Sequence, residues 1–254
     1  MATAALRKES REGIIETLKN DEQYYGDFGK AFLSNSDIDT LLNNPKDYGK
    51  SRPDSKALIE GRYFHQLLIE PEKAALTPFV DASTRNTNIY KEFLQTTGMP
   101  FCLLKKEGED MRSLVSAIKG NIAFYDEIYR AGNQYEVPEF GEIHGMLWKG
   151  KADIVTEDCI IDLKTTSDIS SFKWSARKYN YDSQCYIYQA LFGKPLVFYV
   201  ADKETHQLGI FRPTESFVKG GEQKVIRAIE AWKKYFGPDA TEDVDNHYID
   251  EYLE

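Results

Sequence analysis

Charged residues, among them Asp153, Asp162 and Lys164, interrupt the apolar runs of the segment GKADIVTEDCIIDLKTT at residues 150–166. The apolar residues predict two β-strands joined by a short turn, one ending near Asp153 and the next running from Cys159 to Lys164. Because side chains alternate along a strand, Asp162 and Lys164 would project from the same face. Burying such charges without a partner is costly, so the fold must either neutralise them or leave them at the surface.

A divalent cation is one natural partner for these charges. Carboxylates of Asp153 and Asp162 are hard oxygen ligands that suit Mg²⁺ or Mn²⁺ and would leave room for water and a phosphate oxygen. Lys164 could then orient or deprotonate the attacking water and offset negative charge on the phosphate. Phosphodiester hydrolysis requires this set of groups. The spacing alone equally allows Asp162 and Lys164 to form a surface ion pair on an edge strand, with Asp153 in a turn.

The spacing of apolar residues changes from helical to strand-like near residue 134, which predicts an α/β fold with a mixed central β-sheet flanked by helices. Before this point we expect an N-terminal helical layer over residues 36–42, 54–69, 84–95 and 108–131. After it we expect strands containing Tyr135–Val137 and Met146–Val155, joined by a turn at Gly141–Gly145, and further strands at 159–164, 196–202 and 207–212. The helices expected in this part cover residues 170–178, 181–192 and 215–235.

The 254 residues show no repeat and no low-complexity linker, so we expect a single domain. Its parts are a mainly helical region at 1–132, an α/β core at 133–238 and an acidic tail at 239–254. The net charge of −9 does not exclude a DNA substrate, because seven carboxylates lie in that tail and the remaining chain carries only −2. We interpret the tail as a solvated terminus, although it could also mimic DNA phosphates.

Cysteine usage and hydropathy favour a protein of the cytoplasm. The three cysteines have no CxxC spacing, which argues against a disulfide framework, structural zinc and an iron-sulfur cluster. Charges interrupt the first 20 residues, so we expect no signal peptide. We also expect no membrane association, because no stretch approaches the roughly 20 apolar residues of a membrane helix. No G-x-x-x-x-G-K-[ST] loop is present, so the predicted hydrolysis would be independent of ATP.

The D-x-K motif that follows an upstream aspartate resembles the PD-(D/E)xK nuclease superfamily. Four further segments, in order over residues 34–193, resemble the branch of RecE-type exodeoxyribonucleases (exodeoxyribonuclease VIII), which is akin to the RecB nuclease domain. They are LSNSDIDTLLNNPKDY, GRYFHQLLIEPEK, QYEV and DSQCYIYQALF. Ala152 departs from the motif, in which a proline shapes the turn. The resemblance implies a restriction-endonuclease-like core and a phage or prophage origin.

The resemblance also implies a metal site. His65, Asp153, Asp162 and the backbone carbonyl of Leu163 would be the ligands, and the imidazole suits Mn²⁺ better than Mg²⁺. From its apolar neighbours alone, His65 would instead be a histidine satisfied at the edge of the helix core.

Three more positions match motif residues of the resemblance. Glu136 would be the strand glutamate, which faces a second metal or a water. Glu139 is the alternative, because both cannot share one face of a regular strand. Gln184 and Tyr188 lie at i and i+4 on one helix face and would bind a phosphate or the scissile nucleotide. The spacing alone predicts that the tyrosines of this helix pack in the core.

Basic and hydroxyl residues that follow the D-x-K strand form a candidate DNA-binding set. Basic residues alternate with aromatic ones there, as expected for a surface that binds the DNA backbone and stacks bases. A solvated charged face is the alternative. The set comprises Thr165, Thr166, Lys173, Arg177 and Lys178.

Together these features predict a metal-dependent, ATP-independent DNA exonuclease that acts on DNA ends. The resemblance implies linear double-stranded DNA as substrate, a role in phage-type recombination, a single-strand annealing protein as partner and a homo-oligomer. The alternative is a non-catalytic, nucleic-acid-binding recombination accessory protein with the same fold.

Overall fold

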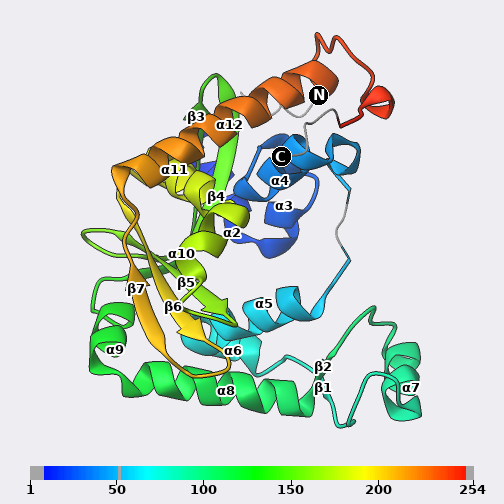
Figure 1. Cartoon of the computed structure of the whole chain (residues 1–254), viewed down its shortest axis with the longest axis vertical. Helices are drawn as coiled ribbons and strands as arrows, with labels where there is room; N and C mark the ends of the chain where they lie inside the picture. Colours follow the sequence, from blue (N-terminus) through cyan, green and yellow to red (C-terminus); the bar gives the residue numbers. More distant parts are fainter. Residues whose placement is uncertain (1–8, 51–52, 250–254) are drawn as a thin grey trace.

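The computed structural model describes residues 9–50 and 53–249, and a five-stranded β-sheet forms its centre (Figure 1). The strands lie in the order β3-β4-β5-β6-β7 and span Gln134–Ile143, Met146–Val155, Ile160–Thr166, Leu196–Asp202 and Leu208–Phe211. Neighbouring strands are antiparallel, except that β5 and β6 are parallel. The sheet is therefore mixed, and every strand that the sequence predicts is present.

Helices cover both faces of the sheet (Figure 1). One face packs against α4, α10 and α11, which span Asn35–Asn43, Phe172–Lys178 and Tyr181–Phe192, and α12, Glu215–Tyr235, packs over α11 and α4. The other face packs against α5, α8 and α9, which span Lys56–Ile69, Lys105–Gly120 and Ile122–Ile128. With both faces covered, β6 is apolar on both sides and almost wholly buried. The predicted α/β class, a mixed sheet flanked by helices, is confirmed.

Shorter elements complete the described chain. They are α2 (Arg11–Lys19), α3 (Asp21–Tyr25), α6 (Pro71–Ala74), α7 (Asn88–Thr97), the parallel pair β1 (Phe79–Val80) and β2 (Leu103–Leu104), and 3₁₀ turns at Gly29–Ala31, Pro45–Asp47 and Val244–Asn246. Part of the predicted acidic tail, residues 250–254, lies outside the described residues, as do residues 1–8 of the N-terminus. No described helix is long and apolar enough to span a bilayer.

Besides α6, β1 and β2, which were not expected, the structure differs from the sequence expectation in three places. Helices α2 and α3 were not expected, and they form where Ile14 and Leu18 pack against the β3–β4 hairpin. The helix expected at 108–131 is divided at Asn121, whose side chain accepts a hydrogen bond from the Phe124 amide and begins α9. The turn expected at Gly141–Gly145 is confined to two residues, His144 and Gly145, which both have positive φ as a tight hairpin requires.

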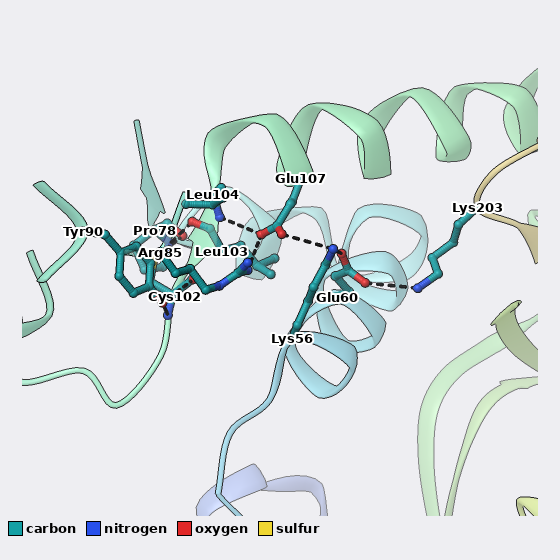
Figure 2. Close-up of polar contacts among 10 residues, drawn as sticks. All are labelled: Lys56, Glu60, Pro78, Arg85, Tyr90, Cys102, Leu103, Leu104, Glu107 and Lys203. Carbon is teal, nitrogen blue, oxygen red and sulfur yellow. Dashed lines mark hydrogen bonds and ion pairs between the residues drawn. The ribbon is translucent and has the colours of Figure 1, made fainter. Parts of the chain in front are cut away.

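A chain of ion pairs holds α5 against α8 and the β6–β7 turn (Figure 2). Lys56 on α5 lies between two acidic side chains, 3.4 Å from Glu60 and 3.1 Å from Glu107 of α8. Arg85 also pairs with Glu107, and Lys203 lies 3.2 Å from Glu60. Both carboxylates are largely buried, so each of them needs these cations. The network fixes the position of α5 relative to the sheet.

The contact between α11 and α12 depends on a glycine. A Cβ at Gly221 of α12 would overlap the backbone carbonyl of Asp182 on α11, whereas a Cβ at Gly61 of α5 would meet open space. We expect Gly221→Ala to lower the free energy of unfolding by about 1–3 kcal/mol. Gly61→Ala, the matched control, should be neutral or stabilising by up to about 1 kcal/mol. Urea unfolding of the two variants measures this difference, and equal midpoints would contradict the close helix contact.

Lys149 of β4 is a buried lysine whose ammonium donates to the Tyr24 carbonyl and lies 4.0 Å from the centroid of the Tyr24 ring. Burial lowers its pKa to about 8. Between pH 8 and about 10, the unfolded chain keeps a proton on this amine that the folded chain has lost, so stability should rise with pH. We expect the parent to gain about 1–3 kcal/mol relative to Lys149→Met over this range. Parallel pH profiles of unfolding free energy would disprove this.

Candidate active site

Strands β4 and β5 separate at the point where the charged residues lie. They pair only through Ile154 with Ile161 and Val155 with Ile160. Beyond these pairs β4 stays with β3, and β5 stays with β6. From Asp153 onward, the edge of β5 at Leu163 therefore faces an opening instead of a neighbouring strand. A buried peptide group at such an edge must find other hydrogen-bond partners.

Two side chains supply the partners that Leu163 has lost. The Leu163 amide donates to Asp153 Oδ2 at 2.7 Å, and the Leu163 carbonyl oxygen lies 2.8 Å from His65 Nε2. His65 Nδ1 in turn lies 3.4 Å from Asp153 Oδ1. The opening thus brings together three of the four predicted metal ligands, from α5, β4 and the backbone of β5.

The protonation states of His65 and Asp153 depend on a balance between burial and their mutual attraction. Burial lowers the pKa of His65, but the Asp153 carboxylate outweighs this effect and raises the pKa to about 9. Burial likewise opposes ionisation of Asp153, but His65 and Lys164 hold the pKa of this carboxyl below its ordinary value. Without a cation, His65 and Asp153 therefore form an ion pair beside the strand opening.

Glu136 completes a cluster with His65 and Asp153. Pairs on either side, Tyr135 with Ile154 and Val137 with Ala152, set Glu136 opposite Asp153. Its φ of +49° is strained for a residue that has a Cβ. One ligand atom from each of the three side chains lies within 4.8 Å of the other two. Burial and the Asp153 carboxylate raise the pKa of Glu136 to about 8, because two carboxylates share the space.

Glu139, the alternative strand glutamate, lies outside this cluster. Its Oε1 accepts hydrogen bonds from Arg11 of α2 and from the Phe140 amide. The geometry therefore favours Glu136 for the role that the sequence left open.

Asp162 is 2% exposed and lies against Lys164 and α11. Lys164 Nζ is 3.0 Å from Oδ2, and Gln184 Nε2 of α11 donates to the same oxygen at 3.2 Å. Oδ1 lies 2.6 Å from Lys164 Nζ, an ion-pair distance, but without hydrogen-bond geometry, so this oxygen has no hydrogen bond among the described residues. Burial raises the pKa of Asp162 to about 6, against the effect of Lys164. Burial lowers the pKa of Lys164, but Asp162 outweighs it and raises the pKa.

Helix α11 braces both sides of the strand opening. Gln184 contacts Asp162 on β5, whereas the Tyr188 hydroxyl donates to the Lys151 carbonyl on β4 at 2.9 Å and accepts from the Lys151 amide at 3.3 Å. The Tyr188 ring also packs against Gly150, where an added Cβ would lie 3.0 Å from the ring. The two residues share one helix face, as the sequence predicts, but Tyr188 is directed at the backbone of β4.

The groups in the opening fit a divalent cation. His65 Nε2 and the Leu163 carbonyl oxygen are separated by 2.8 Å, close to the distance of about 3 Å between adjacent ligands of an octahedral ion with bonds of about 2.1 Å. Asp162 Oδ1 is a buried carboxylate oxygen that has the Lys164 ammonium at 2.6 Å but no hydrogen bond of good geometry among the described residues, so it can still act as a ligand. One imidazole nitrogen together with carboxylate and carbonyl oxygens suits Mn²⁺ or Mg²⁺.

The candidate DNA-binding residues lie beyond Lys164. Thr165 and Thr166 end β5, and the Thr166 hydroxyl bonds the backbone of Asp168. Lys173 and Lys178 are exposed on α10. Arg177 of the same helix is directed at neighbouring groups, 3.9 Å from Asp182 and 5.0 Å from the centroid of the Phe217 ring.

Sequence reasoning missed Lys151, which lies two residues before Asp153 on β4. Its side chain is 7% exposed, and its ammonium lies 2.6 Å from Asp21 of α3. The alternation of Lys149, Lys151 and Asp153 was the available signal, because i and i+2 residues share a strand face. The partner could not be foreseen, since α3 itself was not expected.

Comparisons with known proteins identify the family and the fold of the chain. The family described as "PDDEXK-like domain of unknown function (DUF3799)" matches residues 32–242. A solved structure of a candidate exonuclease from Eubacterium rectale has a TM-score of 0.61 at 20% identity, covering 92% of this chain and 96% of its own. This likeness shows the fold and confirms the predicted restriction-endonuclease-like core. The structure of SSO0001 has a TM-score of only 0.32 at 14% identity, covering 78% of this chain and 85% of its own. No curated protein matches the sequence.

Replacing Glu136 and Glu139 one at a time by glutamine tests which of them belongs to a metal site. We expect Mn²⁺ to raise the melting temperature of the parent, because a ligand that binds only the folded state stabilises it. Glu136→Gln should reduce this metal-induced shift, whereas Glu139→Gln, the matched control, should retain it. Thermal unfolding with Mn²⁺ and with EDTA measures the shifts. Equal shifts in the parent and in both variants would exclude Glu136 from the site.

Proposed function

Because the chain belongs to the family of PDDEXK-like domains, and so to the PD-(D/E)xK nuclease superfamily, we propose that it is a metal-dependent, ATP-independent DNA exonuclease. The observation that supports this proposal most is the opening between β4 and β5. There His65, Asp153 and the Leu163 peptide contact one another beside the buried Asp162. A purely structural role would not require this costly set of charges in one buried place.

In this proposal, His65, Asp153, Asp162 and the Leu163 carbonyl hold Mg²⁺ or Mn²⁺, with Glu136 at the side of the cluster. When bound, the cation supplies Lewis-acid stabilisation of a phosphate oxygen and a lowered pKa for a water. The other groups act by position. The hydrogen bond from the Leu163 amide orients Asp153, and the donation from Gln184 orients Asp162.

Lys164 is the proposed catalytic cation. It extends from the same strand face as Asp162, and its ammonium is already 2.6 Å from that carboxylate. At this place it can bind a phosphate oxygen, orient the attacking water and offset the charge that develops during hydrolysis. Gln184 and Tyr188 are proposed as the α11 contribution. Gln184 orients Asp162, and Tyr188 holds β4 at the opening through Lys151.

The substrate that we propose is the end of linear double-stranded DNA in the cytoplasm, processed for phage-type recombination. The resemblance of residues 34–193 to RecE-type exonucleases supports this choice, together with a single-strand annealing protein as partner and a homo-oligomeric form. Thr165, Thr166, Lys173, Arg177 and Lys178 are the proposed contacts to the DNA backbone, because they follow the catalytic strand.

Digestion of matched DNA forms tests the proposed activity. We expect linear duplex DNA to be shortened with Mg²⁺ or Mn²⁺ while covalently closed circles survive, and EDTA to stop the reaction. Lys164→Ala and Asp162→Ala should each lower the rate by at least about 100-fold, since each removes charge stabilisation from the transition state. Glu139→Gln serves as the control with retained activity.

Other outcomes assign other functions. Nicked or linearised circles would show an endonuclease. Retained DNA binding without any hydrolysis, in the parent as in the variants, would identify a non-catalytic accessory protein with this fold.

A further inference from the structure

Two large aromatic side chains are exposed next to the candidate active site. Trp174 of α10 is 73% exposed, and Tyr179, which follows this helix, is 58% exposed. The other two tryptophans are buried or partly buried, Trp148 at 0% and Trp232 in an intermediate position. An exposed tryptophan forgoes the free energy that burial would supply, and its flat ring is available to stack on a ligand.

A lysine ammonium lies near each of these two rings. The ammonium of Lys173 lies 5.0 Å from the centroid of the Trp174 ring, and that of Lys178 lies 5.9 Å from the centroid of the Tyr179 ring. Neither lysine forms an ion pair with any residue in 9–50 or 53–249. The surface therefore combines flat apolar faces with positive charge that no carboxylate of the described chain neutralises.

The surface is continuous with the proposed catalytic lysine. Lys164 Nζ lies 4.9 Å from the centroid of the Tyr181 ring, and the centroids of Tyr181 and Tyr179 are 6.0 Å apart. Between the two tyrosines, Asn180 has a left-handed backbone with φ +58°. The rings of Tyr181 and Tyr179 thus lead from Lys164 outward to the end of α10, the helix that carries Trp174.

The turn between the two tyrosines is held firmly in place. Its carbonyl at Asn180 accepts hydrogen bonds from Asn35 at 3.2 Å and from the Ser183 hydroxyl at 2.9 Å, and the Asn180 side chain accepts one from Lys224 at 2.8 Å. Three elements, α4, α11 and α12, therefore position Tyr179 and Tyr181. A pre-positioned ring binds a flat partner at a lower cost in conformational entropy.

We propose that Trp174, Tyr179 and Tyr181, with Lys173 and Lys178, form a platform on which the bases of an unpaired DNA strand stack as it enters the active site. This inference deepens the proposed function and rests on it. An apolar protein partner would have to bury both ammonium groups without counter-charges, which is unfavourable. A nucleic acid strand supplies phosphates for the lysines and base faces for the rings. In the interior of a duplex those faces are covered by neighbouring base pairs, whereas each base of an unpaired strand can expose its face to a protein ring.

The test is a fluorescence titration of the whole chain with oligothymidylate in EDTA, so that no DNA is hydrolysed. We expect the emission of Trp174 to be quenched. Trp174→Phe should lose this quenching but keep the affinity, measured by anisotropy of a labelled strand, within about twofold. Trp174→Ala and Tyr179→Ala should each raise Kd by about tenfold, the effect of losing one stacked base. Tyr125→Ala, which removes a 46% exposed tyrosine from α9 on the opposite face of the sheet, is the control and should bind like the parent.

Two results would overturn the platform: parent-like Kd values for both Trp174→Ala and Tyr179→Ala, or covalently closed duplex DNA, which has no ends, that competes as well as the single strand. Failure of the nuclease proposal would look different. A chain that binds oligothymidylate through Trp174 but hydrolyses no DNA with Mg²⁺ or Mn²⁺ would refute the nuclease and retain the platform. A chain that degrades DNA ends while both alanine variants bind normally would refute only the platform.

Discussion

The backbone hydrogen bonds of one residue, Leu163, organise the whole candidate site. Where β4 leaves β5, the Leu163 amide and carbonyl lose their strand partner and are taken up by Asp153 and His65. A buried peptide group left without partners would cost more than most single contacts contribute. The same two bonds that satisfy the backbone therefore bring an imidazole, a carboxylate and a carbonyl oxygen to one place.

Two separate layers hold this opening in its shape. On one side α11 reaches both strands, through Gln184 to Asp162 and through Tyr188 to Lys151. On the other side the ion pairs around Lys56 and Glu107 fix α5, the helix that carries His65 (Figure 2). Helix α5 lies 98 residues before the strand that His65 contacts, whereas α11 follows that strand after only one intervening helix, so the site depends on both faces of the sheet being covered.

Some charged side chains at the opening between β4 and β5 have a partner of opposite charge among the described residues, and others do not. His65 and Asp153 neutralise each other, whereas Glu136 has a raised pKa and Asp162 keeps one oxygen without a hydrogen bond. Strain at Glu136 adds to this cost, since its backbone adopts a positive φ beside Asp153. Local strain and unpaired buried charge of this kind are typical of functional sites, where binding of a ligand can offset their unfavourable free energy. A divalent cation bound here would offset the repulsion between the Glu136 and Asp153 carboxylates.

Local patterns were sufficient for much of the fold. The period of two along a strand placed Asp162 and Lys164 on one face, and caps and periodicity located every strand of the central sheet and most of the helices, because these are short-range properties. The helices α2 and α3 were not predicted, because their few apolar residues form no clear periodic pattern in the sequence. These residues become buried only where they pack on the β3–β4 hairpin.

The choice between Glu136 and Glu139 needed the tertiary structure, because it depends on a strained φ and on Arg11, which lies 128 residues away in the chain. The sequence likewise did not predict that the Tyr188 hydroxyl would contact the backbone of β4. The sequence by itself proposed the residues for the chemistry and determined the strand face that Asp162 and Lys164 share. Only the tertiary structure decided how they meet, because the separation of β4 from β5 is a long-range event that no local pattern encodes.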